Sequence, residues 1–262
     1  MKHKEGTFKG YKDYKIYYQC WLPEGKVKAV LFIAHGFAEH SGRYGNVVNH
    51  FVPKGYAVWA LDHRGHGRSD GERVQVDDSS DYIKDMKTFF DMVRKENPGK
   101  QVFLIGHSMG SMIALNYAFE YQRELAGLVT SGGGISRPGE PPPAARPAGQ
   151  PLDTTFLSRD PAVISAYVND PLVYRGPMPQ RSGMTNLRTR LTEMAPKMTL
   201  PALIMAGNDV PDGERSQALY EFIGSKDKTL KRYNGLRHEI FNEPEYPQVM
   251  ADLERWLEAH IK

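Results

Sequence analysis

Apolar residues along the chain follow two alternating patterns. Short, nearly unbroken apolar runs, typical of strands buried on both faces, fall in residues 27–36, 56–65, 101–105, 125–134 and 201–207. Between them, apolar residues recur every three or four positions, most clearly in residues 77–97, where Tyr82, Met86 and Phe89 share one helix face. Strands that alternate with helices predict an α/β fold, with a mostly parallel sheet covered by helices on both faces.

The two ends of the chain complete this fold. Residues 7–22 alternate as a pair of hairpin strands, residues 44–52 form a helix, and residues 228–235 supply the last strand. A final helix places Val249, Leu253, Trp256 and Leu257 on one face. We therefore assign residues 1–134 and 196–262 to one α/β core.

Residues 135–195 interrupt the alternation. The stretch "SRPGEPPPAARPAGQP" contains six prolines, which exclude a regular helix or a central strand. The insertion follows a strand on the edge that also carries Ser108, so we predict a cap over that edge, although a solvated surface excursion is the alternative. Apolar side chains could form the inner wall of a cap: Phe156, Leu157, Val163, Ile164, Tyr167, Leu172, Val173 and Tyr174.

Composition narrows the class of protein. The net charge of +3 is small for 262 residues, and the basic residues are scattered rather than gathered in a stripe, so nucleic acid is not an expected partner. Cys20 is the single cysteine, which excludes an internal disulfide and a thiolate metal cage and fits a reducing compartment. The sequence has neither a signal-peptide pattern nor an apolar stretch of membrane-spanning length. A cytoplasmic protein is the resulting expectation.

The stretch "QVFLIGHSMGSMIAL", residues 101–115, places Ser108 in a Gly-x-Ser-x-Gly pattern between a predicted strand and a predicted helix. Such an abrupt turn forces the serine to a positive φ, and Gly106 and Gly110 relieve the crowding around it. The serine hydroxyl then points outward at the carboxyl edge of the sheet. Ser108 is the candidate nucleophile, and a glycine-rich turn without chemistry is the alternative.

A serine nucleophile needs a base and an acid that orients the base. In the order serine, acid, histidine that this architecture favours, only His238 and His260 follow Ser108, and His260 lies at the end of the last helix. His238, in the loop after the last strand, is therefore the candidate base. The segment "NDVPDGER" offers Asp209, Asp212 and Glu214 as the acid. We favour Asp209 because it comes two residues after the strand ends, whereas Asp212 could cap the next helix.

Backbone donors and metal ligands complete the candidate chemistry. Met109, at the start of a helix, and Phe37, in the loop after "VLFIAHG", are the expected N–H donors for an oxyanion. A histidine group could suggest zinc: His35, His40, His63 and His66. No HExxH or comparable carboxylate spacing accompanies these histidines, so we predict no metal and no cofactor.

Four segments, "HGFAEHSGRY", "DHRGHGRSDGER", "GHSMGS" and "GLRHEIFNEPE", together resemble the monoacylglycerol lipase and lysophospholipase group of the α/β-hydrolases. The resemblance implies a triad of Ser108, Asp209 and His238 with Phe37 and Met109 as the oxyanion hole. It also implies that Glu39 and Arg43 lie near the glycerol end of the substrate, although their i,i+4 spacing equally permits a structural ion pair. Members of this group usually carry a longer turn than "NDVPDGER" and an apolar helical cap.

This resemblance implies a cofactor-independent ester hydrolase that cleaves monoacylglycerols to fatty acid and glycerol through an acyl-enzyme. Its expected partner is a small lipid ester substrate. A transient contact of the cap with a membrane surface is also expected. A general carboxylesterase, a lysophospholipase, a proline-type aminopeptidase and a ligand receptor with slow turnover are the alternatives. Haloalkane dehalogenase and epoxide hydrolase chemistry are disfavoured because both use an aspartate where this chain has Ser108.

Overall fold

A twisted, mostly parallel sheet of eight strands forms the centre of the molecule, seen in a computed structural model that describes residues 1–137, 139–140, 149–177 and 190–262. The strands are β1 (Lys2–Lys9), β2 (Lys15–Leu22), β3 (Val30–Ala34), β4 (Ala57–Leu61), β5 (Val102–His107), β6 (Gly127–Ser131), β7 (Ala202–Gly207) and β8 (Lys228–Tyr233). Their order is β1-β2-β4-β3-β5-β6-β7-β8. Only the β1–β2 and β2–β4 pairs are antiparallel, so the carboxyl ends of the six strands from β3 to β8 meet at one edge.

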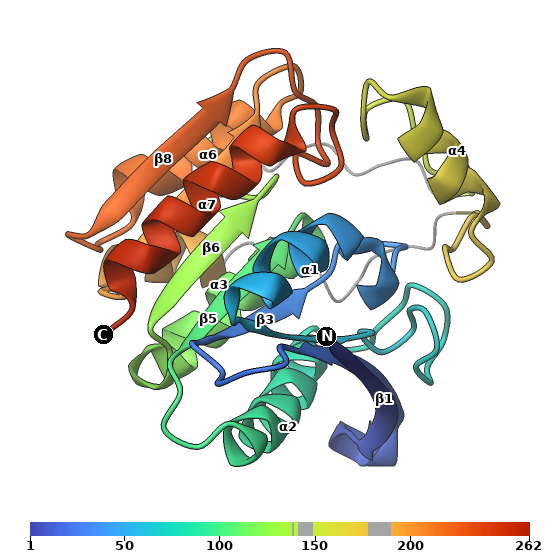
Figure 1. The fold of residues 1–262 in the computed structure, drawn as a ribbon. Coiled ribbons are helices and arrows are strands. Elements are labelled where there is room, and N and C mark those ends of the chain that lie inside the picture. The colour runs from blue at the N-terminus through green and yellow to red at the C-terminus, as the bar shows by residue number, and fades with distance from the viewer. Residues whose placement is uncertain (138, 141–148, 178–189) are drawn as a thin grey trace.

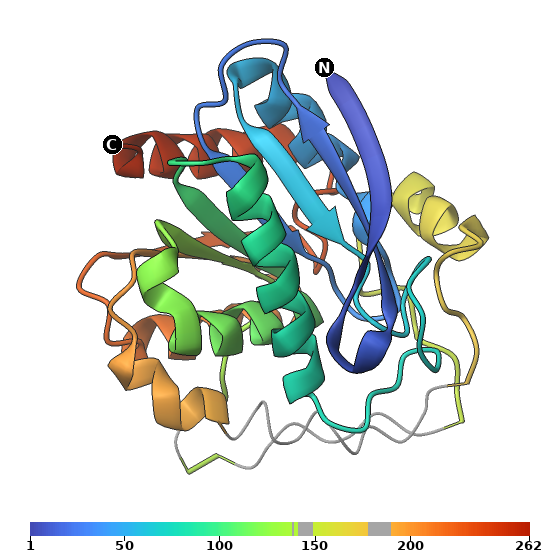
Figure 2. The same cartoon turned by 90° about the horizontal axis from the view of Figure 1, so that it is seen from below.

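Helices cover both faces of this sheet (Figures 1 and 2). Their bounds are α1 (Gly45–Phe51), α2 (Ser80–Glu96), α3 (Met109–Tyr121), α4 (Pro161–Asn169), α6 (Asp212–Phe222) and α7 (Tyr246–His260), with short 3-10 turns at Tyr11–Asp13, Ser41–Arg43, Val52–Lys54, Gln122–Glu124 and Ala195–Lys197. Helices α1 and α7 pack on one face, and α2, α3 and α6 pack on the other. The predicted doubly covered α/β core is confirmed.

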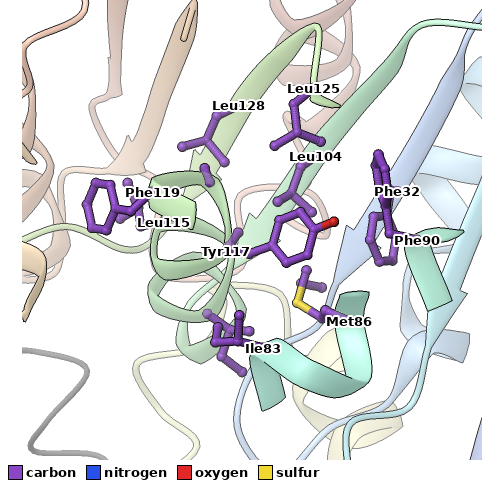
Figure 3. Packing of buried hydrophobic residues seen from close by; sticks show 14 of the residues in the cluster. Phe32, Ile83, Met86, Phe90, Leu104, Leu115, Tyr117, Phe119, Leu125 and Leu128 are labelled. Atoms are coloured by element: carbon purple, nitrogen blue, oxygen red, sulfur yellow. The ribbon is translucent and has the colours of Figure 1, made fainter. Parts of the chain in front are cut away.

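The alternation of side chains along the central strands creates two cores. In β3, Phe32 faces the α2 and α3 side whereas Leu31 and Ile33 face the α1 and α7 side. Figure 3 shows Phe32 and Leu104 meeting Met86 and Phe90 of α2 and Tyr117 of α3. All five side chains are buried. Because both faces are filled in this way, the central strands are rigid supports for the loops at their carboxyl ends.

The predicted insertion contains helix α4, and its described residues 190–194 are also helical. Helix α4 lies apart from the helices that cover the sheet (Figure 1), with Asp160 as its N-cap and Pro161 at its first position. Leu157, Tyr167 and Val173 are buried in a small apolar cluster of their own. Phe156, Val163, Ile164, Leu172 and Tyr174, the other predicted wall residues, are partly exposed. Most of the proline-rich stretch, residues 138 and 141–148, lies outside the described residues.

Candidate active site

Ser108 lies between the end of β5 and the start of α3, as the sequence predicts. Its backbone is in an unusual region, at φ 54° and ψ −116°, which a non-glycine residue adopts only under strain. A Cβ on Gly110 would come within 2.0 Å of the Ala34 carbonyl oxygen, and one on Gly106 within 2.5 Å of the Gly110 carbonyl oxygen. The two glycines therefore permit the close approach of strand and helix that presents the serine.

Ser108 and His238 converge at the end of β6. The Ser108 N–H donates to the Ser131 carbonyl at 2.8 Å. A Cβ on the next residue, Gly132, would lie 3.1 Å from the His238 ring, so the imidazole packs directly against this turn. The ring of His107, which precedes the serine, lies 4.8 Å from the ring of His238 between centroids. Two loops that are distant in sequence thus bring the serine and the histidine to one place.

The acid that contacts His238 is Asp212 and not Asp209, so our preference for Asp209 as its partner is wrong. Asp212 Oδ2 lies 2.5 Å from His238 Nδ1, and both side chains are only 9% exposed. Asp209 is exposed, and its Oδ1 accepts the Gly235 N–H at 3.0 Å.

Pairing beyond the end of β7 explains the error. The Asn208 N–H donates to the Tyr233 carbonyl, and the Asp209 N–H donates to the Leu236 carbonyl, so the chain still runs beside the β8 segment at Asp209. It turns back over the sheet edge only at the first turn of α6, which Asp212 begins. A residue at the start of this helix, rather than one at the strand end, therefore reaches the histidine. The turn "NDVPDGER", shorter than is usual in the resembling group, is the sequence feature that left the identity of the acid open.

The loop after β3 lies beside the serine. A Cβ on Gly36 would lie 3.2 Å from Ser108 Cβ, so Phe37, the next residue, is a close neighbour of the site. Met109 is buried and begins α3, where the first N–H groups of a helix have no partner within the helix. The loop itself is fixed by Glu39, whose Oε1 accepts the Gly36 N–H at 2.6 Å.

Glu39 and Arg43 form the ion pair that their spacing permits. Arg43 donates to Glu39 Oε2 at 2.9 Å and makes a two-pronged contact with Glu239 at 2.6 and 2.8 Å. Burial raises the pKa of Glu39, but the Arg43 charge, together with His107, His35 and the Gly36 N–H, more than offsets burial and holds this pKa at about 2. The Arg43 guanidinium lies 4.5 Å above the Tyr167 ring of α4. This buried network therefore joins the loop after β3, the His238 loop and helix α4.

The histidine rings in this region are buried and only partly hydrogen-bonded, since both ring nitrogens of His63 and Nε2 of His66 have no hydrogen-bond partner among the described residues. His35 Nε2 accepts the His63 N–H at 2.8 Å, and His66 Nδ1 lies 3.0 Å from the Arg64 carbonyl oxygen. Burial lowers the pKa values of His35, His63 and His66, so all three rings are neutral near pH 7. Within the described ranges, no cluster of three or more metal-ligating side chains occurs.

The insertion contacts the core around the site. The Tyr174 N–H donates to the Ala38 carbonyl at 2.8 Å, and His40 Nε2 lies 2.9 Å from Asp170 Oδ2. A cavity of about 240 Å³ lies between this end of the insertion, the loop after β3 and the loop after β4, lined by Ala38, Gly65, His66, Gly67, Arg73 and residues 171–175. The lining does not include Ser108 or His238. The cavity thus borders the site without containing it.

Residues 156–157 of the insertion pair with the His238 loop, a contact that sequence reasoning missed. The His238 N–H donates to the Phe156 carbonyl at 3.2 Å, and the Glu239 N–H donates to the Leu157 carbonyl at 2.8 Å. The Phe156 ring lies 5.0 Å from the His238 ring. No local sequence pattern announces a pairing between segments about 80 residues apart.

Comparisons with known proteins agree with this geometry. A protein family described as "Serine aminopeptidase, S33" matches residues 25–245. The chain belongs to this hydrolase family. It is 35% identical over 274 residues to a monoacylglycerol lipase of Mycolicibacterium smegmatis, covering 98% of both chains. Human monoglyceride lipase is 32% identical over 261 residues, which cover 92% of this chain and 86% of the human protein.

The solved structures give the same result for the fold of this family member. A soluble variant of the monoglyceride lipase of Saccharomyces cerevisiae, bound to a substrate analog, superposes with a TM-score of 0.84 at 26% identity, over 99% of this chain and 95% of that one. The predicted α/β-hydrolase fold and the resemblance to the monoacylglycerol lipase group are both confirmed. Among the residues that the structure describes, none of the helices combines the length and the apolar composition needed to span a bilayer.

Proposed function

We propose that this hydrolase cleaves monoacylglycerols, or closely similar single-chain esters, to a fatty acid and glycerol through an acyl-enzyme on Ser108. The observation that carries the proposal is the convergence of a strained serine with a buried histidine–aspartate pair at the carboxyl edge of the sheet. In this proposal Ser108 is the nucleophile, His238 the base and Asp212 the acid that orients it.

The reaction follows from this arrangement. Asp212 accepts the hydrogen bond from His238 Nδ1, which leaves Nε2 free to act as the base. Nε2 takes the proton from Ser108 Oγ as that oxygen bonds to the ester carbonyl carbon. The tetrahedral intermediate collapses, the bond to the glycerol oxygen breaks, and glycerol leaves with the proton from Nε2. Water then gives a proton to His238 Nε2 as its oxygen bonds to the acyl carbon. The bond from that carbon to Ser108 Oγ breaks, Oγ takes the proton back from Nε2, and the fatty acid is released.

Two backbone donors stabilise the negative oxygen of the intermediate in this proposal. They are the N–H groups of Phe37 and Met109, which flank Ser108 from the loop after β3 and from the start of α3. The hydrogen bond from Gly36 to Glu39 stiffens the first of these segments. Glu39 and Arg43 support the oxyanion hole by fixing the loop after β3, through the ion pair between them and the bond from Gly36 to Glu39.

The substrate class rests on the relatives. The bacterial and human relatives are lipases of monoacylglycerols by name, and the match to the bacterial enzyme extends over almost the full length of both chains. The family description names an aminopeptidase, which would need an acidic pocket for a substrate amine. The acidic side chains nearest the site, Asp212, Glu39 and Glu239, are all engaged with His238 or Arg43. An ester is therefore the better substrate.

We further propose that residues 135–195 act as a cap with an apolar inner face and that the cap touches a membrane surface when substrate enters. The buried cluster of Leu157, Tyr167 and Val173 supports an ordered cap rather than a solvated linker. The buried, unpaired thiol of Cys20 fits the reducing conditions of a cytoplasmic location.

The nucleophile is tested by covalent labelling. A fluorophosphonate probe is expected to add to Ser108, with one probe molecule bound per protein chain. Ser108→Ala is expected to lose both labelling and esterase activity. Ser111→Ala is the control, because that hydroxyl is buried and bonded to the Gly106 carbonyl. Labelling or activity that persists in Ser108→Ala contradicts the proposal.

The substrate class is tested with a series of 1-monoacylglycerols from short to long chains beside a matched triacylglycerol. Each methylene enclosed by the cap contributes about 0.8 kcal/mol, or about fourfold, so kcat/KM is expected to rise with chain length until the pocket is full. A triacylglycerol should react more slowly because its other two chains cannot enter. Faster cleavage of the triacylglycerol, or no dependence on chain length, would show that the cap does not enclose the acyl chain.

A further inference from the structure

Glu243 is a carboxylate buried completely within the loop that follows His238. Its Oε1 accepts the N–H of Arg237, the residue before the histidine, at 2.9 Å. The same oxygen accepts the N–H of Arg159, which lies in the insertion just before α4, at 3.1 Å. Arg159 Nε lies 3.4 Å from the other oxygen and supplies the opposite charge that a buried carboxylate needs. One side chain thus joins the His238 loop to the segment of the insertion that precedes α4.

The contact between the His238 loop and residues 155–159 supplies acceptors for the backbone N–H groups around the histidine. The N–H groups of Arg237, His238 and Glu239 donate, in that order, to Glu243 Oε1, to the Phe156 carbonyl and to the Leu157 carbonyl. None of the three belongs to a helix or a strand. The position of His238 is therefore set by Glu243 and by residues 156–157, which are themselves held by Glu243 through Arg159.

A second set of bonds strengthens the same junction. The Arg237 guanidinium donates to the Thr155 carbonyl at 2.7 Å and to the Ser158 carbonyl at 3.2 Å. Phe156 lies between Thr155 and Ser158 in the sequence, and its ring packs against the His238 imidazole. Asp212, by contrast, reaches His238 from α6, on a different element. The histidine–aspartate bond forms only if the loop and α6 are correctly placed relative to each other.

We propose that Glu243 is a positioning residue for His238 and that residues 155–159 are a fixed part of the catalytic support rather than a lid that opens during turnover. The inference rests on the proposed function of His238 as the base. Glu243 touches no reacting atom in this proposal, and it acts by holding Arg237 and Arg159 on one carboxylate oxygen. Loss of that contact displaces the imidazole from Ser108, and displacements of about 1 Å at a catalytic group cost about a hundredfold in rate.

Two conservative variants separate positioning from charge. Glu243→Gln keeps the reach of the side chain and one acceptor oxygen but removes the charge. Glu243→Asp keeps the charge but withdraws the oxygens by about 1.5 Å, the length of one C–C bond. We expect kcat on a 1-monoacylglycerol within about threefold of the parent enzyme for Gln and at least about tenfold lower for Asp, with KM within about threefold in both.

Glu245→Gln is the matched control, because Glu245 is an exposed carboxylate that pairs with the same Arg159 but does not contact Arg237. It is expected to keep the parent kcat. Thermal melting shows whether each variant is folded at the assay temperature. The opposite ranking, with Asp active and Gln impaired, or a loss confined to KM, overturns the positioning role. If Glu243→Asp does not fold, Glu243→Gln decides, since a loss of kcat beyond threefold overturns the proposal.

Failure of the proposed function would look different. The parent enzyme would then not cleave monoacylglycerols, whereas positioning would still be measured by the rate of fluorophosphonate labelling of Ser108 and by the NMR signal of the proton between His238 Nδ1 and Asp212. We expect both to change in Glu243→Asp and to be retained in Glu243→Gln and Glu245→Gln. Unchanged labelling and an unchanged proton signal in a folded Glu243→Asp protein refute the inference.

Discussion

The replacement of Asp212 by asparagine tests the pairing that the structure shows in place of the one that we favoured from the sequence. The 2.5 Å contact joins two side chains that are each 9% exposed. Two opposite charges about 4 Å apart at an effective dielectric constant of about 20 attract by about 4 kcal/mol, which corresponds to about a thousandfold in rate when the imidazolium forms in the transition state. Asparagine also removes the preference for the correct tautomer, and the combined loss in other serine triads is about ten-thousandfold.

We therefore expect Asp212→Asn to lower kcat by about 10³- to 10⁴-fold with little change in melting temperature. Asp209→Asn is the matched control, since an amide oxygen can still accept the Gly235 N–H and the side chain is exposed. Initial rates on a p-nitrophenyl ester and on a 1-monoacylglycerol, with thermal melting of each variant, give the comparison. An inactive Asp209→Asn beside an active Asp212→Asn would refute the reasoning.

Two further predictions concern stability. Gly110→Ala should lower the free energy of unfolding by about 3 kcal/mol or more, because its Cβ would come within 2.0 Å of the Ala34 carbonyl oxygen. Urea unfolding measures this loss, with Gly25→Ala as the control because no atom lies within 4 Å of a Cβ there. Equal stability of the two variants would contradict the prediction. Burial and the nearby His238 lower the pKa of His107 to about 4, so the unfolded chain, with a histidine pKa of about 6.5, binds more protons between these values. Stability is then fully present above pH 6.5 and falls by up to about 3 kcal/mol as the pH drops towards 4. Melting temperatures across this range should fall less steeply in His107→Asn, and parallel curves would argue against the assignment.

Local patterns in the sequence predict most of the fold because the central strands are buried on both faces. Residues 27–36 have a nearly continuous apolar pattern for this reason, and β3 occupies residues 30–34 within them. The strained turn at Ser108 is also a local event, since a strand, one residue and a helix follow directly along the chain. Both could be predicted without knowledge of distant contacts.

Other features depend on distant pairing and could not be predicted in this way. Asp209 does not contact His238, because hydrogen bonds with Tyr233 and Leu236 hold residues 208–209 beside the segment that follows β8. Glu243 shows the same limit, since its sequence context reads as an ordinary loop carboxylate and only the pairing with Arg159 and Arg237 reveals what it holds. In both cases the partner is fixed by tertiary packing of segments that no local rule connects.

The order of the strands also bears on association between sheets of different molecules. The outermost strands, β1 and β8, leave one side of their backbone without a neighbouring strand among the described residues, and such edges are templates for association with other chains. Both carry charged side chains along their length, with Lys2, Lys4 and Lys9 in β1 and Lys228, Lys231 and Arg232 in β8. A second edge approaching either strand would have to desolvate or oppose these cations. The strongly apolar inner strands thus lie between two charged edge strands. Replacing the lysines of β1 with valine is expected to promote edge-to-edge pairing of sheets and fibrillar assembly.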